Sequence, residues 1–143
     1  MGGFLGSYRH TLDAKGRVSL PAPFRHGSDA EGFVLVRAHP DALTLYPDDR
    51  WEQVAADLAD LRRRKPAKRH MVLQLTANAH RIVPDAQGRM LIPERLRQEI
   101  GLEDEALIVG ALDRIEIWSP RRFEELTSAA DDEFDELAAS IFA

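Results

Sequence analysis

Two short stretches of the chain combine an acid, a glycine and an arginine at the same spacing. Asp13-Ala14-Lys15-Gly16-Arg17 is matched by Asp85-Ala86-Gln87-Gly88-Arg89, and positions 13 and 85 differ by 72. Aspartate at the start and glycine at the end favour a type I turn closed by a left-handed glycine. Such a turn requires nothing at the arginine position, where an outward guanidinium can bind a phosphate or a guanine edge through two hydrogen bonds. The candidate nucleic-acid contacts are therefore the cations of the turns: Arg17, Lys15 and Arg89.

The acids and glycines of these stretches have a structural role that needs no ligand. Asp13 and Asp85 can cap their turns by accepting backbone N–H bonds, while Gly16 and Gly88 supply a positive φ. Two aspartates related by a pseudo-twofold axis could also be imagined as a catalytic pair. Each, however, has a turn to cap and an arginine four positions further on, so we assign all four residues to turn structure.

Three further arginines near the turns add positive charge and are also candidate DNA contacts: Arg9, Arg25 and Arg81. The formal net charge of the whole chain is −5, but nucleic-acid binding depends on the charge of one face rather than on the total. The acid lies elsewhere, in the predicted helices and in the C-terminal segment, which contains Asp131, Asp132, Glu133, Asp135 and Glu136. Positive and negative charge are therefore segregated along the chain.

The repeat extends well beyond the turns, so the chain contains two copies of one unit. Identities at the same ungapped offset include Arg9 with Arg81, Arg25 with Arg97, Leu35 with Leu107, and Asp41 with Asp113. A unit of about 70 residues would be marginally stable by itself. The repeat therefore predicts two units that share one core.

Each copy is predicted to contain a hairpin, a short helix, a pair of strands and a longer helix. In the first copy, residues 7–12 and 18–20 alternate as the strands of a hairpin around the turn. Pro21 opens the short helix, the strands at 33–36 and 43–45 follow, and Pro47 precedes an amphipathic helix. The second copy repeats this order, with strands at 106–109 and 115–117 and with helices opened by Pro93 and Ser119-Pro120.

Two segments lie outside the repeat. A basic run from Arg62 to Arg69, more often a solvated helix face than a binding site, joins the copies through a helix that ends near Asn78. The acidic C-terminal segment has apolar residues at helical spacing, so this amphipathic tail needs a surface in its own body or in a neighbouring subunit. The expected organisation is repeat 1 at 4–61, a connecting helix at 62–78, repeat 2 at 79–127 and a helical tail at 128–143.

Composition and missing motifs argue against several classes of protein. There is no cysteine, so no disulfide or thiolate metal site can form, and the five histidines lack metal-ligand spacing. Glycine-rich cofactor motifs, the phosphate loop and the nucleophile elbow are missing too, so we expect neither an enzyme nor a cofactor. No apolar run approaches a membrane span and no signal peptide is evident, which indicates a soluble cytoplasmic protein.

These motifs resemble those of the MraZ family, bacterial proteins of the SpoVT-AbrB-like group. The resemblance rests on Phe4-Leu5-Gly6, on residues 12–21 with Phe24-Arg25, and on residues 85–93 and 110–118. It covers nearly the whole chain and weakens over the basic linker and the acidic tail. It implies an α+β fold of two tandem AbrB-like units, each a β-hairpin and strand pair with flanking helices, packed as an intramolecular pseudo-dimer with a β-barrel-like core.

The resemblance also implies a sequence-specific DNA-binding transcriptional regulator. Such a protein would typically be a repressor of the division and cell-wall gene cluster that includes its own gene. It would bind short direct repeats in promoter DNA as a ring-shaped homo-oligomer, associated with the nucleoid. No cofactor, metal, membrane or small-molecule substrate is implied.

The family's Asp-x-x-x-Arg motif maps onto two pairs: Asp13 with Arg17, and Asp85 with Arg89. Lys15 in the first turn is replaced by Gln87 in the second. We therefore expect the first turn to carry more of the attraction for phosphate. The leading alternative is an AbrB-fold protein-interaction module, antitoxin-like or a scaffold, that acts through its amphipathic tail without direct DNA readout.

Overall fold

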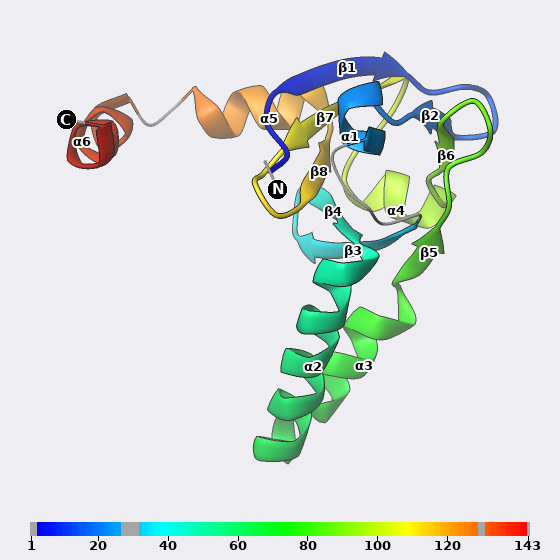
Figure 1. Ribbon diagram of the computed structural model, residues 1–143, viewed down its shortest axis with the longest axis vertical. Coiled ribbons are helices and arrows are strands. Elements are labelled where there is room, and N and C mark those ends of the chain that lie inside the picture. The colour runs from blue at the N-terminus through cyan, green and yellow to red at the C-terminus, as the bar shows by residue number, and fades with distance from the viewer. Residues whose placement is uncertain (1–2, 27–31, 129–130, 143) are drawn as a thin grey trace.

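The computed structural model describes residues 3–26, 32–128 and 131–142 (Figure 1). The strands are β1 (Ser7–Thr11), β2 (Arg17–Ser19), β3 (Phe33–His39), β4 (Ala42–Pro47), β5 (His80–Ile82), β6 (Arg89–Leu91), β7 (Glu105–Gly110) and β8 (Ile115–Trp118). The α-helices are α1 (Ala22–His26), α2 (Asp48–Arg64), α3 (Arg69–Ala77), α4 (Glu94–Glu99), α5 (Pro120–Thr127) and α6 (Asp131–Phe142). A 3-10 turn, η1 (Pro66–Lys68), lies between α2 and α3.

The strands of the two copies are interleaved in one antiparallel sheet. Its order is β1-β7-β8-β4-β3-β5, while β2 and β6 form a separate two-stranded ladder. Strand β1 of the first copy pairs with β7 of the second, and β5 of the second pairs with β3 of the first. The equivalent strands β4 and β8 pair at the centre. The predicted α+β pseudo-dimer of two tandem units within one chain is confirmed (Figure 1).

The predicted hairpin between residues 7–12 and 18–20 is wrong. Strand β1 pairs with β7 and strand β2 pairs with β6, so the two strands do not pair with each other. The turn between them does form, because the N–H of Gly16 donates to the carbonyl of Asp13 at 3.0 Å. Alternation of apolar residues indicates which face of a strand is buried but not which strand is its neighbour. In this chain the other copy supplies the neighbour of both strands.

The constant offset of 72 between equivalent positions of the two copies fails by one residue in strands β3 and β7. Val34 pairs with Tyr46, whereas Leu107 pairs with Trp118. Positions 46 and 118 differ by 72, so their partners Val34 and Leu107 are equivalent in the structure. The sequence offset had predicted Leu35 as the equivalent of Leu107. A register shift later in β3 restores the offset. An extra residue in a strand is accommodated by such a bulge without loss of the flanking pairs.

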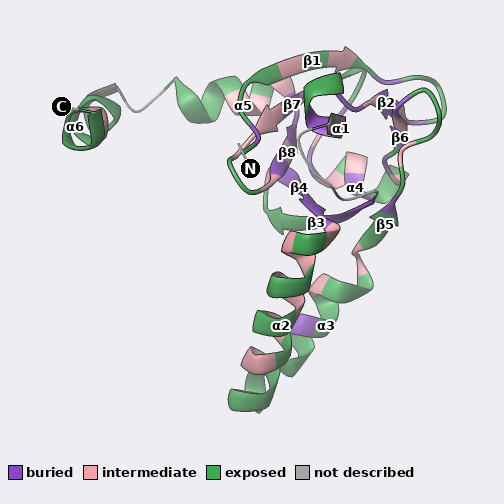
Figure 2. Cartoon of the chain, in the orientation of Figure 1, coloured by how far each residue is buried: buried purple, intermediate pink, exposed green. Residues whose placement is uncertain are grey.

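One apolar core is built from both copies. Phe24 and Leu20 from the first copy and Ile92 and Leu96 from the second are at most 1% exposed, and the central strands add Leu43, Leu45, Ile115 and Ile117. Buried residues follow the sheet and the short helices in Figure 2. Each fully buried side chain of this size stabilises the fold by about 1.5–3 kcal/mol. The two copies therefore stabilise each other.

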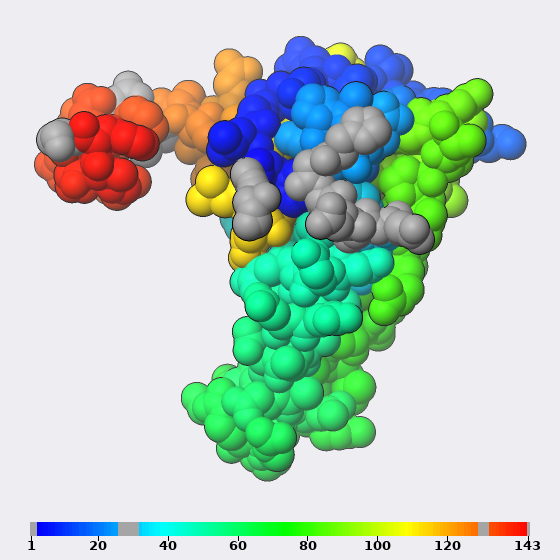
Figure 3. Space-filling model, viewed as in Figure 1, coloured from blue at the N-terminus to red at the C-terminus, as the bar shows by residue number. Residues whose placement is uncertain are grey.

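Helices α2 and α3 form a helical hairpin that extends away from the sheet (Figures 1 and 3). Pro47 precedes α2, and Asp48 and Asp49 lie in its first turn, where negative charge complements the helix dipole. Val72 is the buried residue of α3. Among the described residues, no helix is long and apolar enough to cross a membrane.

Candidate nucleic-acid interface

The two repeated turns meet where β2 pairs with β6. Val18 lies opposite Met90, and these are equivalent positions of the two copies, so the pseudo-twofold axis passes between them. Both side chains are buried, at 1% and 2% exposure. The turns that precede the two strands project at the same side of the molecule (Figure 1).

The opposite face of this ladder carries both motif arginines. Arg17 pairs with Leu91, and Arg89 pairs with Ser19. Because alternate residues of a strand share a face, Arg17, Ser19, Arg89 and Leu91 all lie on the face away from Val18 and the core. Arg17 and Arg89 are diagonal neighbours, with Cα atoms roughly 7–8 Å apart. The fold therefore places two guanidinium groups next to each other on one outward surface.

Asp13 holds both its turn and its arginine. Its Oδ1 accepts the backbone N–H groups of Lys15 and Arg17, both at 2.9 Å, and its Oδ2 accepts Nε of Arg17 at 2.8 Å. The bond from the backbone N–H of Arg17 is the main cause that lowers the pKa of Asp13 below its ordinary value of 3.8. The carboxylate is therefore ionised at neutral pH and fixes the guanidinium from one side.

Asp85 repeats this arrangement in the second copy. Its Oδ1 accepts the N–H groups of Gln87 and Arg89 at 2.9 Å, and its Oδ2 accepts Nε of Arg89 at 3.1 Å. The N–H of Arg89 is again the main cause that lowers the aspartate pKa. In the described part of the chain, no group accepts a hydrogen bond from the terminal nitrogens of Arg17 or Arg89. These nitrogens are oriented and available for an external acceptor.

The glycine of each turn lies against an arginine from the short helix of the other copy. Gly16 has φ +86° and Gly88 has φ +79°, a region that side chains other than glycine rarely adopt. A Cβ atom on Gly16 would stand 2.6 Å from Cζ of Arg97, and a Cβ on Gly88 would overlap the guanidinium of Arg25. The backbone angle therefore favours glycine at both positions, and a side chain there would also have to displace an arginine side chain of the other copy.

Hydrogen bonds between the copies fix the turns further. Arg25 Nη1 donates to the carbonyl of Gln87 at 3.3 Å. The carbonyl of Gly88 accepts the N–H of Leu20 at 2.8 Å, and the carbonyl of Gly16 accepts the N–H of Ile92 at 3.0 Å. Each turn is thus held by residues of the opposite copy.

The remaining predicted cations occupy different places. Lys15 is exposed at the first turn, and Arg25 is half-buried beneath the second turn, where its Nε has no hydrogen-bond partner among the described residues. Arg9 on β1 and Arg81 on β5 are equivalent, because they pair with Leu107 and Val34. Both lie outside the β2–β6 ladder.

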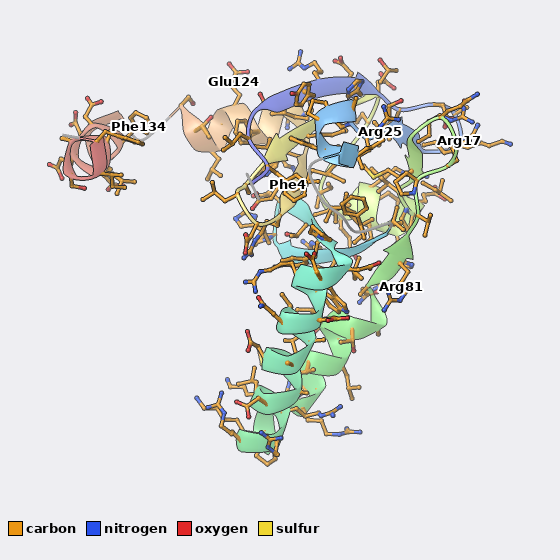
Figure 4. The ribbon with its side chains drawn as sticks, viewed as in Figure 1. Phe4, Arg17, Arg25, Arg81, Glu124 and Phe134 are labelled. Carbon is orange, nitrogen blue, oxygen red and sulfur yellow. The ribbon has the colours of Figure 1, made fainter. Side chains whose placement is uncertain are left out.

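Arg81 has a partner of its own, since its Nη1 lies 3.2 Å from Oδ1 of Asp48. Figure 4 shows Arg81 beside the helical hairpin and Arg17 at the outer edge of the turns. The structure therefore brings together Arg17, Lys15 and Arg89, with Arg25 behind them, and leaves Arg9 and Arg81 apart.

Two residues of this region were not assigned to the site from the sequence, one on the outward face and one behind the first turn. Leu91 is 52% exposed and lies beside the two arginines on the outward face, and Arg97 supports the first turn. The alternation of β6 contained the signal for Leu91, since position 91 shares a face with position 89. Arg97 is the repeat counterpart of Arg25, but its contact with Gly16 depends on the interleaving of the copies.

A sequence model of the family described as "MraZ protein, putative antitoxin-like" matches residues 4–74 and 75–142. The chain belongs to the MraZ family. Proteins named "Transcriptional regulator MraZ" are similar over nearly all of it. The relative from Herpetosiphon aurantiacus is 39% identical over 140 residues, which cover 98% of this chain and 97% of the relative. The relative from Pediococcus pentosaceus is 36% identical over 138 residues, 96% of each chain.

A third MraZ relative, from Thermomicrobium roseum, is 41% identical over 120 residues, 84% of each chain. The two matched MraZ units correspond to the two copies found by the sequence repeat, and each contains one Asp-x-x-x-Arg turn. In this chain the pair of turns is one structural unit, because neither turn is held by its own copy alone.

Proposed function

We propose that this protein is a DNA-binding transcriptional regulator that contacts promoter DNA through the outward face of the β2–β6 ladder. The observation that carries the proposal is the pair Arg17 and Arg89, which lie on one face with Nε bound to an aspartate and, among the described residues, both terminal nitrogens free for an acceptor. The names of the similar proteins, each a transcriptional regulator, support the same function.

The chemistry of this face suits a nucleic acid. A guanidinium whose orientation is fixed loses little conformational entropy when it binds, and its fork fits a phosphate or the O6 and N7 of guanine. Lys15 adds a third charge near the tip of the first turn. The negative charge of the chain as a whole does not oppose this contact, because Debye screening limits its range to about 10 Å.

Three cations would bind DNA only weakly, so the proposal includes assembly into a ring. Linked copies raise avidity by about 10² to 10⁴ when their spacing fits the DNA. Neighbouring subunits of a ring face the duplex in the same sense, which matches short direct repeats better than a palindrome. We propose that the ring represses the division and cell-wall gene cluster that contains its own gene.

Binding to DNA from upstream of the protein's own operon tests the proposal. Affinity is measured by fluorescence anisotropy at several salt concentrations for the parent, Arg17→Ala, Arg89→Ala and the control Arg121→Ala, whose side chain is exposed on α5. Each motif variant is expected to weaken binding, and the control to retain it. Removing a phosphate contact reduces the salt slope by about 0.9, whereas removing a base contact reduces discrimination by about 1–3 kcal/mol. Unchanged affinity in both motif variants would refute the proposal.

A protein-interaction module is the second candidate, because α6 exposes Phe134, Leu137 and Ile141 to solvent. Under this alternative, the parent protein has no preference for its promoter over unrelated DNA of equal length. The same titration with a scrambled duplex distinguishes the two functions.

A further inference from the structure

Helix α6 carries an apolar stripe on an acidic surface. Phe134, Leu137 and Ile141 recur at helical spacing and are between 59% and 68% exposed. The helix contains five acidic residues and no lysine or arginine. A helix of 12 residues is marginally stable alone in water, and an exposed apolar stripe marks a contact surface. Helix α6 therefore requires a partner surface, and its charge indicates a basic one.

The far end of the α2–α3 hairpin carries the opposite charge. Its six exposed cations are Arg62, Arg63, Arg64, Lys65, Lys68 and Arg69. Asp60 pairs with Arg63 and Arg64, and within the described ranges the other four cations have no ion-pair partner. Two apolar side chains of α3 follow directly, Met71 at 52% and Leu73 at 41% exposure. This basic end therefore offers cations for the carboxylates of α6 and apolar side chains for its exposed stripe.

The hairpin of a neighbouring copy fits this role better than the hairpin of the same chain. The 17 residues of α2 place the basic end about 25 Å from the sheet at 1.5 Å per residue. Helix α5 leaves the sheet in a different direction from the hairpin (Figure 1). Three residues separate α5 from α6, and they can span at most about 14 Å. The tail is therefore directed away from its own hairpin.

We propose that α6 of one copy binds the basic end of the α2–α3 hairpin of a neighbouring copy. The carboxylates of α6 would pair with the free cations, and its apolar stripe would pack beside Met71 and Leu73. The contact is head to tail, so it closes into a ring or extends as a chain, depending on the rotation between copies. It deepens the ring assembly of the proposed function, but it needs no DNA to form.

The test reverses the charge on each side of the contact. The tail-reversed variant carries Asp132→Lys, Glu133→Lys and Glu136→Lys. The hairpin-reversed variant carries Arg62→Glu, Lys65→Glu and Lys68→Glu. A charge-matched control carries Glu103→Lys, Glu105→Lys and Glu124→Lys, which are exposed outside α6. Mass is measured by sedimentation velocity without DNA, and thermal melting establishes that each full-length variant is folded.

Either reversal alone is expected to shift the protein to smaller assemblies, whereas the control retains the parent mass. Mixing the two reversed variants restores opposite charges between different chains, so large assemblies should return. The parent assembly should also weaken as salt is raised, because exposed ion pairs are screened.

Three results would overturn the contact. The first is a parent mass that neither reversal changes. The second is loss of assembly that mixing does not restore, while a single chain with all six substitutions recovers it, because α6 then binds its own hairpin. The third is a hairpin reversal that abolishes promoter binding without changing mass, because the basic end then contacts nucleic acid. The first two results do not bear on Arg17 and Arg89. The third adds a DNA contact at the hairpin and leaves the contribution of those two arginines to their own variants.

Discussion

The guanidinium of Arg25 occupies the space where a side chain on Gly88 would have to stand. Arg25 belongs to the short helix of the first copy and Gly88 to the turn of the second. The same relationship joins Arg97 to Gly16. Each turn that presents a motif arginine is thus supported by the opposite copy, so the shape of one turn depends on the folding of both.

Gly88→Ala is expected to lower the free energy of unfolding by at least about 1–2 kcal/mol. The left-handed backbone alone costs a residue with a side chain about that much, and the new methyl group must also displace Arg25. Urea denaturation followed by circular dichroism measures the change. The control is Ala86→Gly, at an exposed position of the same turn. A Gly88→Ala protein as stable as its parent would contradict the left-handed backbone at position 88.

Removing either supporting arginine is expected to loosen the turn of the other copy. Arg25→Ala should raise amide hydrogen exchange in residues 85–89, and Arg97→Ala should raise it in residues 13–17, because each arginine packs on the turn of the other copy. Exchange measured by mass spectrometry on matched peptides distinguishes the two turns. If each variant instead loosened the turn of its own copy, the assignment of support between copies would be wrong.

Acid should destabilise the protein through Asp113. Hydrogen bonds from Arg114 at 2.9 Å and from Arg50 at 2.6 Å lower the pKa of Asp113 from 3.8 to about 2, and the bond from Arg114 is the larger cause. As the pH falls, the unfolded chain therefore binds a proton at Asp113 at a higher pH than the folded chain does. The stabilisation is complete above about pH 4 and is lost as the pH falls toward 2.

Asp113→Asn should reduce the dependence of stability on pH between about 4 and 2, and should cost less than about 1 kcal/mol at neutral pH, since the ion pair is partly exposed. Urea denaturation at several pH values gives the comparison, with Asp57→Asn on the exposed surface of α2 as the control. An Asp113→Asn protein with the same acid dependence as its parent would exclude this carboxylate as a source.

The sequence repeat predicted the pseudo-dimer but not how its strands pair. A constant offset between Asp13 and Asp85 shows that two units exist, and alternation identified the buried face of β1 and β2. Neither signal contains the identity of the neighbouring strand, because a hairpin and an exchanged pairing bury the same residues. The one-residue slip that matches Leu107 with Val34 was also hidden, since a bulge later in β3 restores the offset.

The candidate interface was predictable only in its local chemistry. The bonds from Lys15 and Arg17 to Asp13 lie within one turn, and the motif spacing implies them. The adjacency of Arg17 and Arg89 depends on pairing between residues 72 positions apart in sequence, and so does the exposure of Leu91 beside them. Arg25 was grouped with the outward cations because its charge is evident from sequence, whereas its packing on Gly88 is not.

The difference between Lys15 and Gln87 makes the two turns unequal, and exchanging these residues tests how DNA uses them. Lys15 is exposed at the first turn, and Gln87 holds the same place in the second. Each donates its backbone N–H to the aspartate of its turn at 2.9 Å, so a change of side chain leaves the turn intact. Lys15→Gln should weaken promoter binding and reduce the salt slope by about 0.9. Gln87→Lys should do the opposite, and the double exchange should return the slope to that of the parent, as measured by anisotropy titrations. If Lys15→Gln changed neither affinity nor slope while Arg17→Ala changed both, the contact with DNA would run along the ladder face and exclude the tip of the turn.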